Sequence, residues 1–387
     1  MNNKKNLKKS IADLKEFWSN HDDYDIREKA REYIDLYNSN GNSDHFSFVH
    51  PEDEPYIKTD GCNAVRWGIP NQVLGDIEKA KFIFGLYNPG TQMKTGIGNK
   101  CKNINEYVEE EQKEEDNTGT VSVNFDSKEY SDDSNFYLEH VISDENIMSQ
   151  ELKKLYKVFK GNWGAVQKEN GDYDSKVVKK IAYYLSAYYS KVFMDNGPKN
   201  GFQNSMIYYC NLFEKMERAK VIVKENSLNY DVEKAFNQAV ENIAICNVEM
   251  VPYRSNVKGD IKKSKKKELV DLPSTSIVAN LIVEKLIVDT DTIAIFRSFS
   301  PEKKTGWRYV LERNAEEQGI NFKENIKPAL YHFSGQNAAF SKNNIKAYDT
   351  SAQNSQKKVD AAINTLLEEL KIQPFVDELD EIIANNK

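Results

Sequence analysis

The sequence predicts an α/β protein built around a small parallel sheet. Short apolar runs that lack the alternation of a half-exposed strand recur along the chain. Segments with helical periodicity separate these runs. Apolar strands that alternate with helices are typical of a parallel sheet covered by helices on both faces. We therefore expect a three-layer α/β/α domain with about four parallel strands.

The expected strands are short apolar runs that end in polar residues. They are residues 81–87, 243–248, 292–296 and 329–332. Helices are expected between the later strands at about 273–287 and 302–318, and after the last strand at about 355–370. The sequence has no phosphate-binding loop of the GxGxxG or GxxxxGKS/T type, which argues against the common dinucleotide and P-loop sites.

Helical segments extend this core at both ends and within it. Residues 1–40 have apolar positions at helical spacing on either side of a polar break, which predicts an N-terminal helical hairpin. Residues 41–350 form the expected α/β/α domain, with a helical and partly acidic insertion at about 100–240. Residues 351–387 are expected to form C-terminal helices packed on the core.

Composition and charge exclude several classes of protein. The chain has 387 residues and a formal net charge of −7, so it lacks the general positive charge of a protein that coats nucleic acid. No apolar run is long enough to span a membrane, and Asp13, Lys15 and Glu16 interrupt the segment where a signal peptide would be apolar. The four cysteines form no C-x-x-C pair. We expect a cytoplasmic protein without a membrane partner, a metal site or a cofactor.

Polar side chains stand at the ends of the four expected strands. Asn88 follows the first strand and Asn247 ends the second. Arg297 follows the third strand and His332 ends the fourth. Ligands of open α/β sheets bind beyond the carboxyl ends of the strands, so we expect these side chains to line one site. Amides, hydroxyls and a histidine suit planar polar groups such as nucleobases better than a metal ion.

Two of these strand ends resemble motifs of a known enzyme family. The segment 85–90, GLYNPG, resembles the G-x-N-P-G motif of the uracil-DNA glycosylase superfamily, with one extra residue before the asparagine. The segment 332–335, HFSG, is similar to the second motif of that superfamily, H-P-S or N-P-S-G, with Phe333 in place of proline. Asn247 is similar to the asparagine that reads the base edge in several branches. The resemblance covers about residues 75–350.

The resemblance implies hydrolysis of the N-glycosidic bond of a uracil-like or modified base, without a metal or cofactor. A base is flipped into the pocket, and negative charge gathers on it as the bond breaks. Asn88 would hold a water molecule through its amide oxygen, Asn247 would pair with the base edge, and His332 would donate to the base oxygen. Because asparagine is not a strong general base, a slow enzyme that depends on positioning is expected.

Further residues around the strand ends are expected to contact the substrate. The candidates for base or substrate binding are Tyr87, Gly90, Thr91, Asn247, Tyr253, Arg254, Ser334 and Asn337. A lysine-rich loop after the second strand is expected to contact the nucleic-acid backbone through Lys262, Lys263, Lys265, Lys266 and Lys267. Such contacts would make binding fall steeply as the salt concentration rises. The expected partner is nucleic acid, DNA in preference to RNA, or a nucleotide.

Simpler interpretations of these residues stay open. Asn88 could belong to a turn that ends a strand, His332 could be a hydrogen-bonded structural histidine, and the lysine-rich loop could be a solvated connection. Two other functions are compatible with the same pocket. One is a non-catalytic module that binds a nucleotide or nucleic acid, and the other is a hydrolase of free nucleosides or nucleotides.

Overall fold

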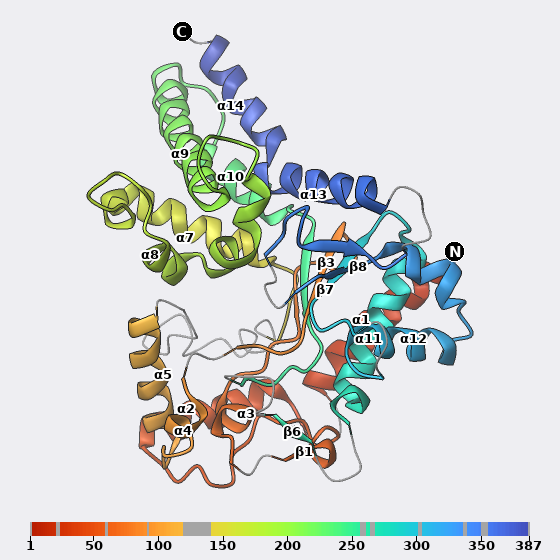
Figure 1. Cartoon of the computed structure of the whole chain (residues 1–387). Helices are drawn as coiled ribbons and strands as arrows, with labels where there is room; N and C mark the ends of the chain where they lie inside the picture. Colours follow the sequence, from red (N-terminus) through yellow and green to blue (C-terminus); the bar gives the residue numbers. More distant parts are fainter. Residues whose placement is uncertain are drawn as a thin grey trace. The chain divides into compact units, whose positions relative to one another are not determined.

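The chain folds into two compact units, each of which is described by itself (Figure 1). Unit 1 comprises Met1–Asp144 and Cys246–Phe333, and unit 2 comprises Glu145–Ile245 and Ser334–Lys387. The computed structural model describes residues 2–20, 24–58, 61–90, 93–118, 141–255, 261–263, 268–300, 304–335, 339–349 and 355–385.

A mixed, mostly parallel sheet forms the centre of the α/β fold, with strand order β4-β2-β5-β3-β7-β8-β9. Its four central strands are β5 (Ile245–Glu249), β3 (Phe82–Leu86), β7 (Ile293–Phe296) and β8 (Leu330–Phe333). Strands β3, β7 and β8 pair in parallel, with Gly85 opposite Phe296 and Phe296 opposite His332. A parallel bridge joins Gly90 and Ser255, beyond the ends of β3 and β5. Each of the four expected strands is therefore present, and the four are neighbours.

The sheet is larger than the small four-stranded sheet that we expected. Three short strands extend it: β2 (Val73–Leu74), β4 (Ile142–Ser143) and β9 (Ile345–Ala347). Strand β2 is antiparallel to β5 and parallel to β4. A separate two-stranded sheet pairs β1 (Ile57–Lys58) with β6 (Lys262–Lys263). Strands of two or three residues are too short to produce a periodic pattern, so the sequence does not reveal them.

The central strands are buried on both sides, which explains why they lack alternation. All five residues of β3 and all five of β5 are buried. Helix α12 (Trp307–Glu317) packs against β3, because the indole Nε1 of Trp307 donates to the carbonyl oxygen of Leu86 at 2.6 Å. A Cβ atom at Gly85 would collide with the Phe296 ring, so a glycine is required there.

Helices of unit 1 surround this sheet. Helix α11 (Pro273–Val288) is apolar almost all round because it packs against both α1 (Asn2–Ser19) and α12, as Figure 1 shows. Helix α2 (Ile26–Ser39) follows α1 at the position of the expected hairpin and packs on α5. The remaining helical segments are η1 (Glu54–Tyr56), α3 (Asn63–Trp67), α4 (Thr95–Gly98), α5 (Ile104–Thr118), η7 (Leu269–Asp271), η8 (Phe322–Ile326) and η9 (Lys327–Ala329).

Unit 2 is mainly helical and joins most of the expected insertion to the C-terminal segment. Its elements besides β9 are α7 (Ile147–Asn162), η3 (Trp163–Val166), α8 (Ser175–Ile181), η4 (Leu185–Tyr189), η5 (Ser190–Phe193), α9 (Gly201–Glu225), α10 (Val232–Glu241), α13 (Ser355–Lys371) and α14 (Gln373–Asn385). Helix α9 packs on α14, and α10 packs on α7 and α14. The helices of 147–241 therefore share a core with those of 355–385.

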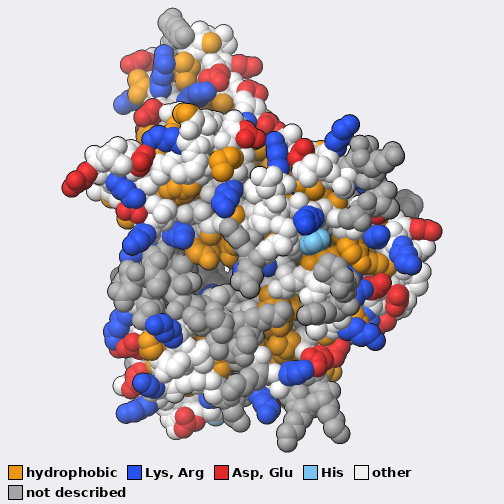
Figure 2. Space-filling view, in the orientation of Figure 1, with side chains coloured by type: hydrophobic (Ala, Val, Ile, Leu, Met, Phe, Trp, Pro, Cys, Tyr) orange, Lys and Arg blue, Asp and Glu red, His pale blue; other side chains and the backbone are white. Residues whose placement is uncertain are grey.

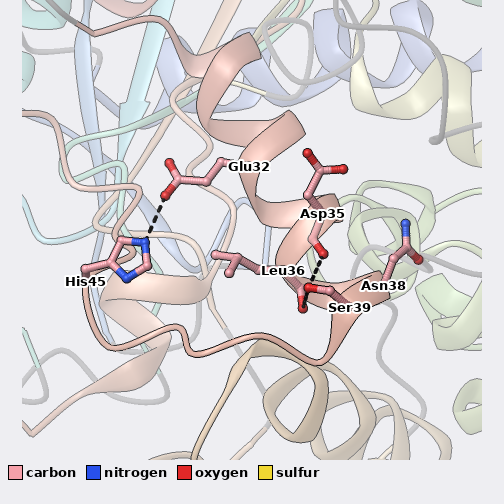
Figure 3. Close-up of a pocket in the computed structure, with 6 residues that line it drawn as sticks. All are labelled: Glu32, Asp35, Leu36, Asn38, Ser39 and His45. Atoms are coloured by element: carbon pink, nitrogen blue, oxygen red, sulfur yellow. Dashed lines mark hydrogen bonds and ion pairs between the residues drawn. The ribbon is translucent and has the colours of Figure 1, made fainter.

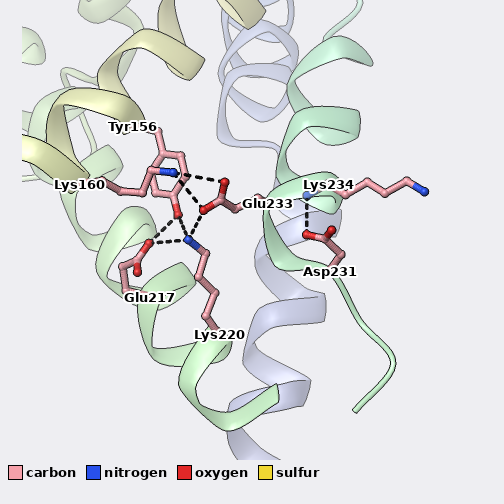
Figure 4. Close-up of polar contacts among 7 residues, drawn as sticks. All are labelled: Tyr156, Lys160, Glu217, Lys220, Asp231, Glu233 and Lys234. Carbon is pink, nitrogen blue, oxygen red and sulfur yellow. Dashed lines mark hydrogen bonds and ion pairs between the residues drawn. The ribbon is translucent and has the colours of Figure 1, made fainter. Parts of the chain in front are cut away.

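A polar cluster fixes three helices of unit 2 to one another (Figure 4). Lys220 on α9 donates to the Tyr156 hydroxyl of α7 at 2.5 Å, to Glu217 at 2.9 Å, and to Glu233 of α10. The Tyr156 hydroxyl in turn donates to Glu217 at 2.5 Å. Lys160 adds an ion pair of 3.0 Å with Glu233. Since these groups satisfy one another and join α7, α9 and α10, we interpret the cluster as structural.

Glu151 makes the stability of unit 2 depend on pH. This α7 residue is 5% exposed, and its carboxyl oxygens accept hydrogen bonds from the backbone N–H groups of Tyr184 and Leu185 at 2.6 and 2.7 Å. Burial raises the pKa of Glu151 to about 7. The folded state therefore binds this proton more tightly than the unfolded state does.

We expect the Glu151 contribution to the free energy of unfolding to be complete below about pH 4.5 and to be lost as the pH rises through about 7. The loss is on the order of 3 kcal/mol. Urea unfolding of wild type and Glu151→Gln across pH 4–8 measures it, because glutamine does not titrate. Parallel pH profiles for the two proteins would contradict the assignment.

Candidate functional site

The topology of unit 1 defines where a ligand would bind. After β3 the chain forms β5 on one side of that strand, and it then crosses to β7 and β8 on the other side. The point where the order reverses lies between β3 and β7, and ligands of open α/β sheets bind at such a point beyond the carboxyl ends. The residues at the ends of β3, β5 and β7 are Tyr87, Asn88, Glu249, Arg297 and Ser298. We call these five residues the switch-point cluster.

Asn88 is held firmly by its amide group. Its Nδ2 donates to the backbone oxygen of Pro89 at 2.8 Å and to the Ser255 Oγ at 2.9 Å, with a longer contact of 3.4 Å to the Tyr253 carbonyl oxygen. Because carbonyl oxygens only accept hydrogen bonds, these partners fix which side of the amide carries the nitrogen. No described residue donates a hydrogen bond to the Asn88 Oδ1, so this oxygen is available for a water molecule or a ligand.

The loop after β5 is hydrogen-bonded to the backbone next to Asn88. The Ser255 N–H donates to the Pro89 carbonyl at 3.2 Å, and the Arg254 guanidinium donates to Ile69 O at 2.8 Å and Gly90 O at 3.2 Å. These bonds attach the residues after β5 to the residues after β3. Arg254, a predicted binding residue, is therefore engaged with backbone carbonyls, and Gly90 is exposed beside it.

Tyr253 supports this loop from inside the core. The side chain is fully buried, and its hydroxyl donates to the Asp53 carboxylate at 2.6 Å while accepting from the His50 N–H at 3.1 Å. Asp53 also accepts from the Ser274 N–H at the start of α11 at 3.1 Å, and burial raises its pKa to about 6. We had expected Tyr253 to contact substrate, but in this structure it positions the loop.

Asn247 lies in the middle of a strand and not at its end. The expected strand stopped at residue 248, whereas β5 runs through Glu249, and Asn247 is opposite Leu74 of β2. Its side chain is buried, with 4% of the residue exposed. The residue that ends β5, the strand next to β3, is Glu249, which sequence reasoning missed. Its signal was a single carboxylate within the apolar run ICNVEMV.

Glu249 is a buried acid at the carboxyl end of β5. The residue is 4% exposed, and its Oε2 has no hydrogen-bond partner within the described part of the chain. Burial raises the pKa of Glu249 well above its usual value, and the positive charges of Arg297 and Arg254 oppose this rise. Burial together with the charge of Glu268 also raises the pKa of Tyr87 to about 12, so its phenol is neutral. Burial therefore favours the protonated forms of the Glu249 carboxyl group and the Tyr87 phenol, and both forms can donate a hydrogen bond.

The backbone after β7 has an unusual conformation. Ser298 and Ser300 have positive φ angles of 57° and 47°. Such angles are uncommon outside glycine, and strained backbone of this kind concentrates at functional sites. The Trp307 N–H donates to the Ser298 carbonyl at 3.2 Å, which helps to hold this turn at the start of α12.

His332 stands at the same edge of the sheet but away from Asn88. Its ring stacks on Phe299, with 5.3 Å between ring centroids and 5° between planes, and its Nδ1 lies 3.2 Å from the Phe333 carbonyl oxygen. Strand β7 separates β3 from β8, so two strand spacings, about 10 Å, separate the ends that carry the two residues. No contact joins Asn88 and His332 among the described residues.

The other predicted residues are distributed as follows. Ser334 belongs to unit 2, where its N–H donates to the Asn344 carbonyl at 2.8 Å. Lys262 and Lys263 form β6, and Lys263 pairs with Glu268. The residues outside the described part of the chain are Thr91, Asn337, Lys265, Lys266 and Lys267.

The surface hollow in Figure 3 belongs to a different part of unit 1. It is lined by Glu32, Asp35, Leu36, Asn38, Ser39 and His45, on α2 and the loop after it. His45 and Glu32 make an ion pair of 3.4 Å. No described group of three or more histidine, cysteine or acidic residues is arranged to hold a metal ion.

Charge on the visible surface is mixed. Figure 2 shows basic and acidic side chains interspersed over the described part of this face, without a continuous field of one sign. A nucleic-acid contact on this face would therefore depend on a local group of residues.

Among the described residues, no helix is both long and apolar enough to span a membrane.

Comparison with known proteins adds no relative. The chain matches no family model, no curated protein and no solved structure. The case for a function therefore depends on the switch-point cluster and its surroundings.

We expect Tyr253→Phe to lower the free energy of unfolding by about 1–3 kcal/mol, because it removes a donor from the buried Asp53 carboxylate. The matched control is Tyr309→Phe on α12, whose hydroxyl makes no hydrogen bond with a described residue. It should change stability by less than about 0.5 kcal/mol. Urea unfolding checks both, and equal effects would show that the Asp53 contact carries no stability.

Proposed function

We propose that this chain is a nucleobase-recognising hydrolase of the uracil-DNA glycosylase type, built on a three-layer α/β/α core. The observation that carries the proposal is the anchoring of Asn88 at the switch point by its Nδ2, which leaves its Oδ1 to accept a hydrogen bond. The neighbouring parallel strands β5, β3, β7 and β8 support it, because the motif-like segments follow β3 and end β8.

In the proposed reaction a flipped nucleotide lies at the switch point, and a water molecule is held by the Asn88 Oδ1. The bond between C1′ of the sugar and the base nitrogen breaks, and its electron pair leaves with the base. The water oxygen bonds to C1′, and the proton that it loses passes to solvent while the base takes up a proton. His332 would hydrogen-bond the base oxygen as charge develops. Asparagine supplies position and not basicity, so the reaction would be slow.

DNA is the preferred partner over RNA, with backbone contacts expected from the lysine-rich segment 262–267. Lys262 and Lys263 lie in β6, close in sequence to the loop that holds Asn88. The mixed charge of the face shown in Figure 2 favours a short contact over an extended one there.

A non-catalytic base-binding module is the second candidate. It is favoured by the separation of Asn88 and His332 across β7 and by the stacking of His332 on Phe299. A hydrolase of free nucleosides or nucleotides would use the same site without the lysine contacts.

The test is abasic-site formation, detected by alkaline cleavage, on single-stranded and duplex oligonucleotides that carry uracil, hypoxanthine, xanthine or 5-hydroxymethyluracil. We expect wild type to form product, and Asn88→Ala and His332→Ala to lower the rate by about 100-fold or more, as the loss of a positioned polar group does. Asn38→Ala, an exposed residue of α2, is the matched control and should leave the rate unchanged.

Other outcomes separate the alternatives. Salt-sensitive oligonucleotide binding without product at high enzyme concentration would establish the binding module. Release of a base from free nucleosides alone would identify a nucleoside hydrolase. The absence of both product and binding would contradict the proposal and both alternatives.

A further inference from the structure

We propose that Glu249 is a further catalytic residue of this site, and that its carboxyl group hydrogen-bonds the carbonyl oxygen of a lactam-type base such as uracil or hypoxanthine. The inference rests on the proposed function and names the substrate class of the same site. It adds Glu249 to His332 as a group that stabilises charge on the departing base.

Glu249 has the position that this role requires. It ends β5, and the next residue, Met250, donates its N–H to the carbonyl oxygen of Leu86 at 3.2 Å. The carboxyl group is thus one strand away from the end of β3, where Asn88 is anchored. The positive charges of Arg297, at the end of β7, and of Arg254, in the loop after β5, both lower the pKa of Glu249.

Glu249 also has an unmet hydrogen-bonding requirement. Its Oε2 is buried and has no partner within the described part of the chain. A buried polar atom without a partner costs folding free energy, and in native proteins it calls for a specific explanation such as a catalytic role or a bound molecule. A ligand that pairs with this oxygen would remove the cost.

The chemistry of a neutral carboxyl group fits a lactam. An acid that keeps its proton presents one O–H donor and one acceptor, which match the adjacent C=O and N–H of uracil or hypoxanthine. As the glycosidic bond breaks, negative charge moves onto the base oxygen, and an O–H donor stabilises it. A carboxylate at the same place would repel that charge. Burial raises the pKa of Glu249 and so favours its protonated form, while the positive charges of Arg297 and Arg254 lower this pKa.

His332 and Glu249 flank the switch point from opposite sides. His332 is on β8, next to β7, and is stacked on Phe299, whereas Glu249 ends β5, next to β3. Asn247 precedes Glu249 by two residues and therefore shares its face of β5, but it lies further from the carboxyl end of the strand. Glu249 is thus the polar side chain of β5 that lies nearest the switch point.

The experiment uses the full chain and compares wild type with Glu249→Gln and Glu249→Leu. Two quantities are measured from pH 5 to pH 8, where the bases keep their ring N–H protons: the rate of abasic-site formation, and the affinity for free uracil and hypoxanthine by calorimetry. 1,3-Dimethyluracil, which keeps the carbonyl groups but has no N–H group, is the control ligand. Glu284→Leu is the matched control variant, because it removes the carboxyl group of another buried glutamate, an α11 residue that is 8% exposed.

We expect wild-type rate and affinity to fall at high pH as Glu249 loses its proton. Glutamine keeps a donor and an acceptor but does not titrate, so Glu249→Gln should remain within about threefold of wild type and lose the pH dependence. Glu249→Leu should lose at least about tenfold in both quantities, which corresponds to one lost hydrogen bond. Its thermal unfolding temperature should not fall, because leucine removes a buried polar group without a partner. Glu284→Leu should match wild type in rate and affinity.

The outcomes distinguish this inference from the proposed function. Product formation that Glu249→Leu leaves unchanged would overturn the role of Glu249 and leave the hydrolase intact. Binding of uracil that depends on Glu249, without any product, would refute hydrolysis and the catalytic role but support base recognition by Glu249. If wild type shows neither binding nor product, both the role of Glu249 and the proposed function are overturned.

Discussion

The pairing between the residues after β3 and the residues after β5 is the constraint on which the site depends. The Val251 N–H donates to the Tyr87 carbonyl at 2.8 Å, and the Ser255 N–H donates to the Pro89 carbonyl at 3.2 Å. The Asn88 amide joins the same two segments. Because these bonds continue the parallel pairing beyond the strands, two loops that would otherwise move independently form one surface.

That surface is supported by a buried acid. Asp53 receives the Tyr253 hydroxyl on one side and the Ser274 N–H of α11 on the other. The loop that holds Asn88 is thereby connected to the N-terminus of a helix that packs against α1 and α12. A chain of hydrogen bonds thus extends from the core helices to the candidate site, and rigid support of this kind is what a positioning residue needs.

The sequence predicted the central fold because the central strands carry a strong signal. Strands β3, β5, β7 and β8 are apolar runs bounded by polar residues, and each was predicted to within about two residues. The two-residue strands β2 and β4 were not predictable, since their pairing depends on backbone hydrogen bonds and not on pattern.

The candidate site was predicted less completely. Asn88 could be identified because a strand ends directly before it, but Tyr253 carries no mark in sequence of its full burial. Glu249 was missed because the expected strand stopped at residue 248 with Asn247 as its polar end, and because the burial of Glu249 depends on neighbours distant in sequence. The association of α7–α10 with 355–385 also depends on long-range packing, which no local pattern reports.

The position of a bound base tests the central claim most directly. A crystal structure with an oligonucleotide that contains 2′-fluorodeoxyuridine, whose glycosidic bond resists hydrolysis, would reveal it. We predict that the base lies beyond the carboxyl ends of β3 and β7, with its carbonyl oxygen within hydrogen-bonding distance of Glu249 and a water molecule on the Asn88 Oδ1. A base bound away from this edge, or an Asn88 Oδ1 turned away from the sugar, would contradict it.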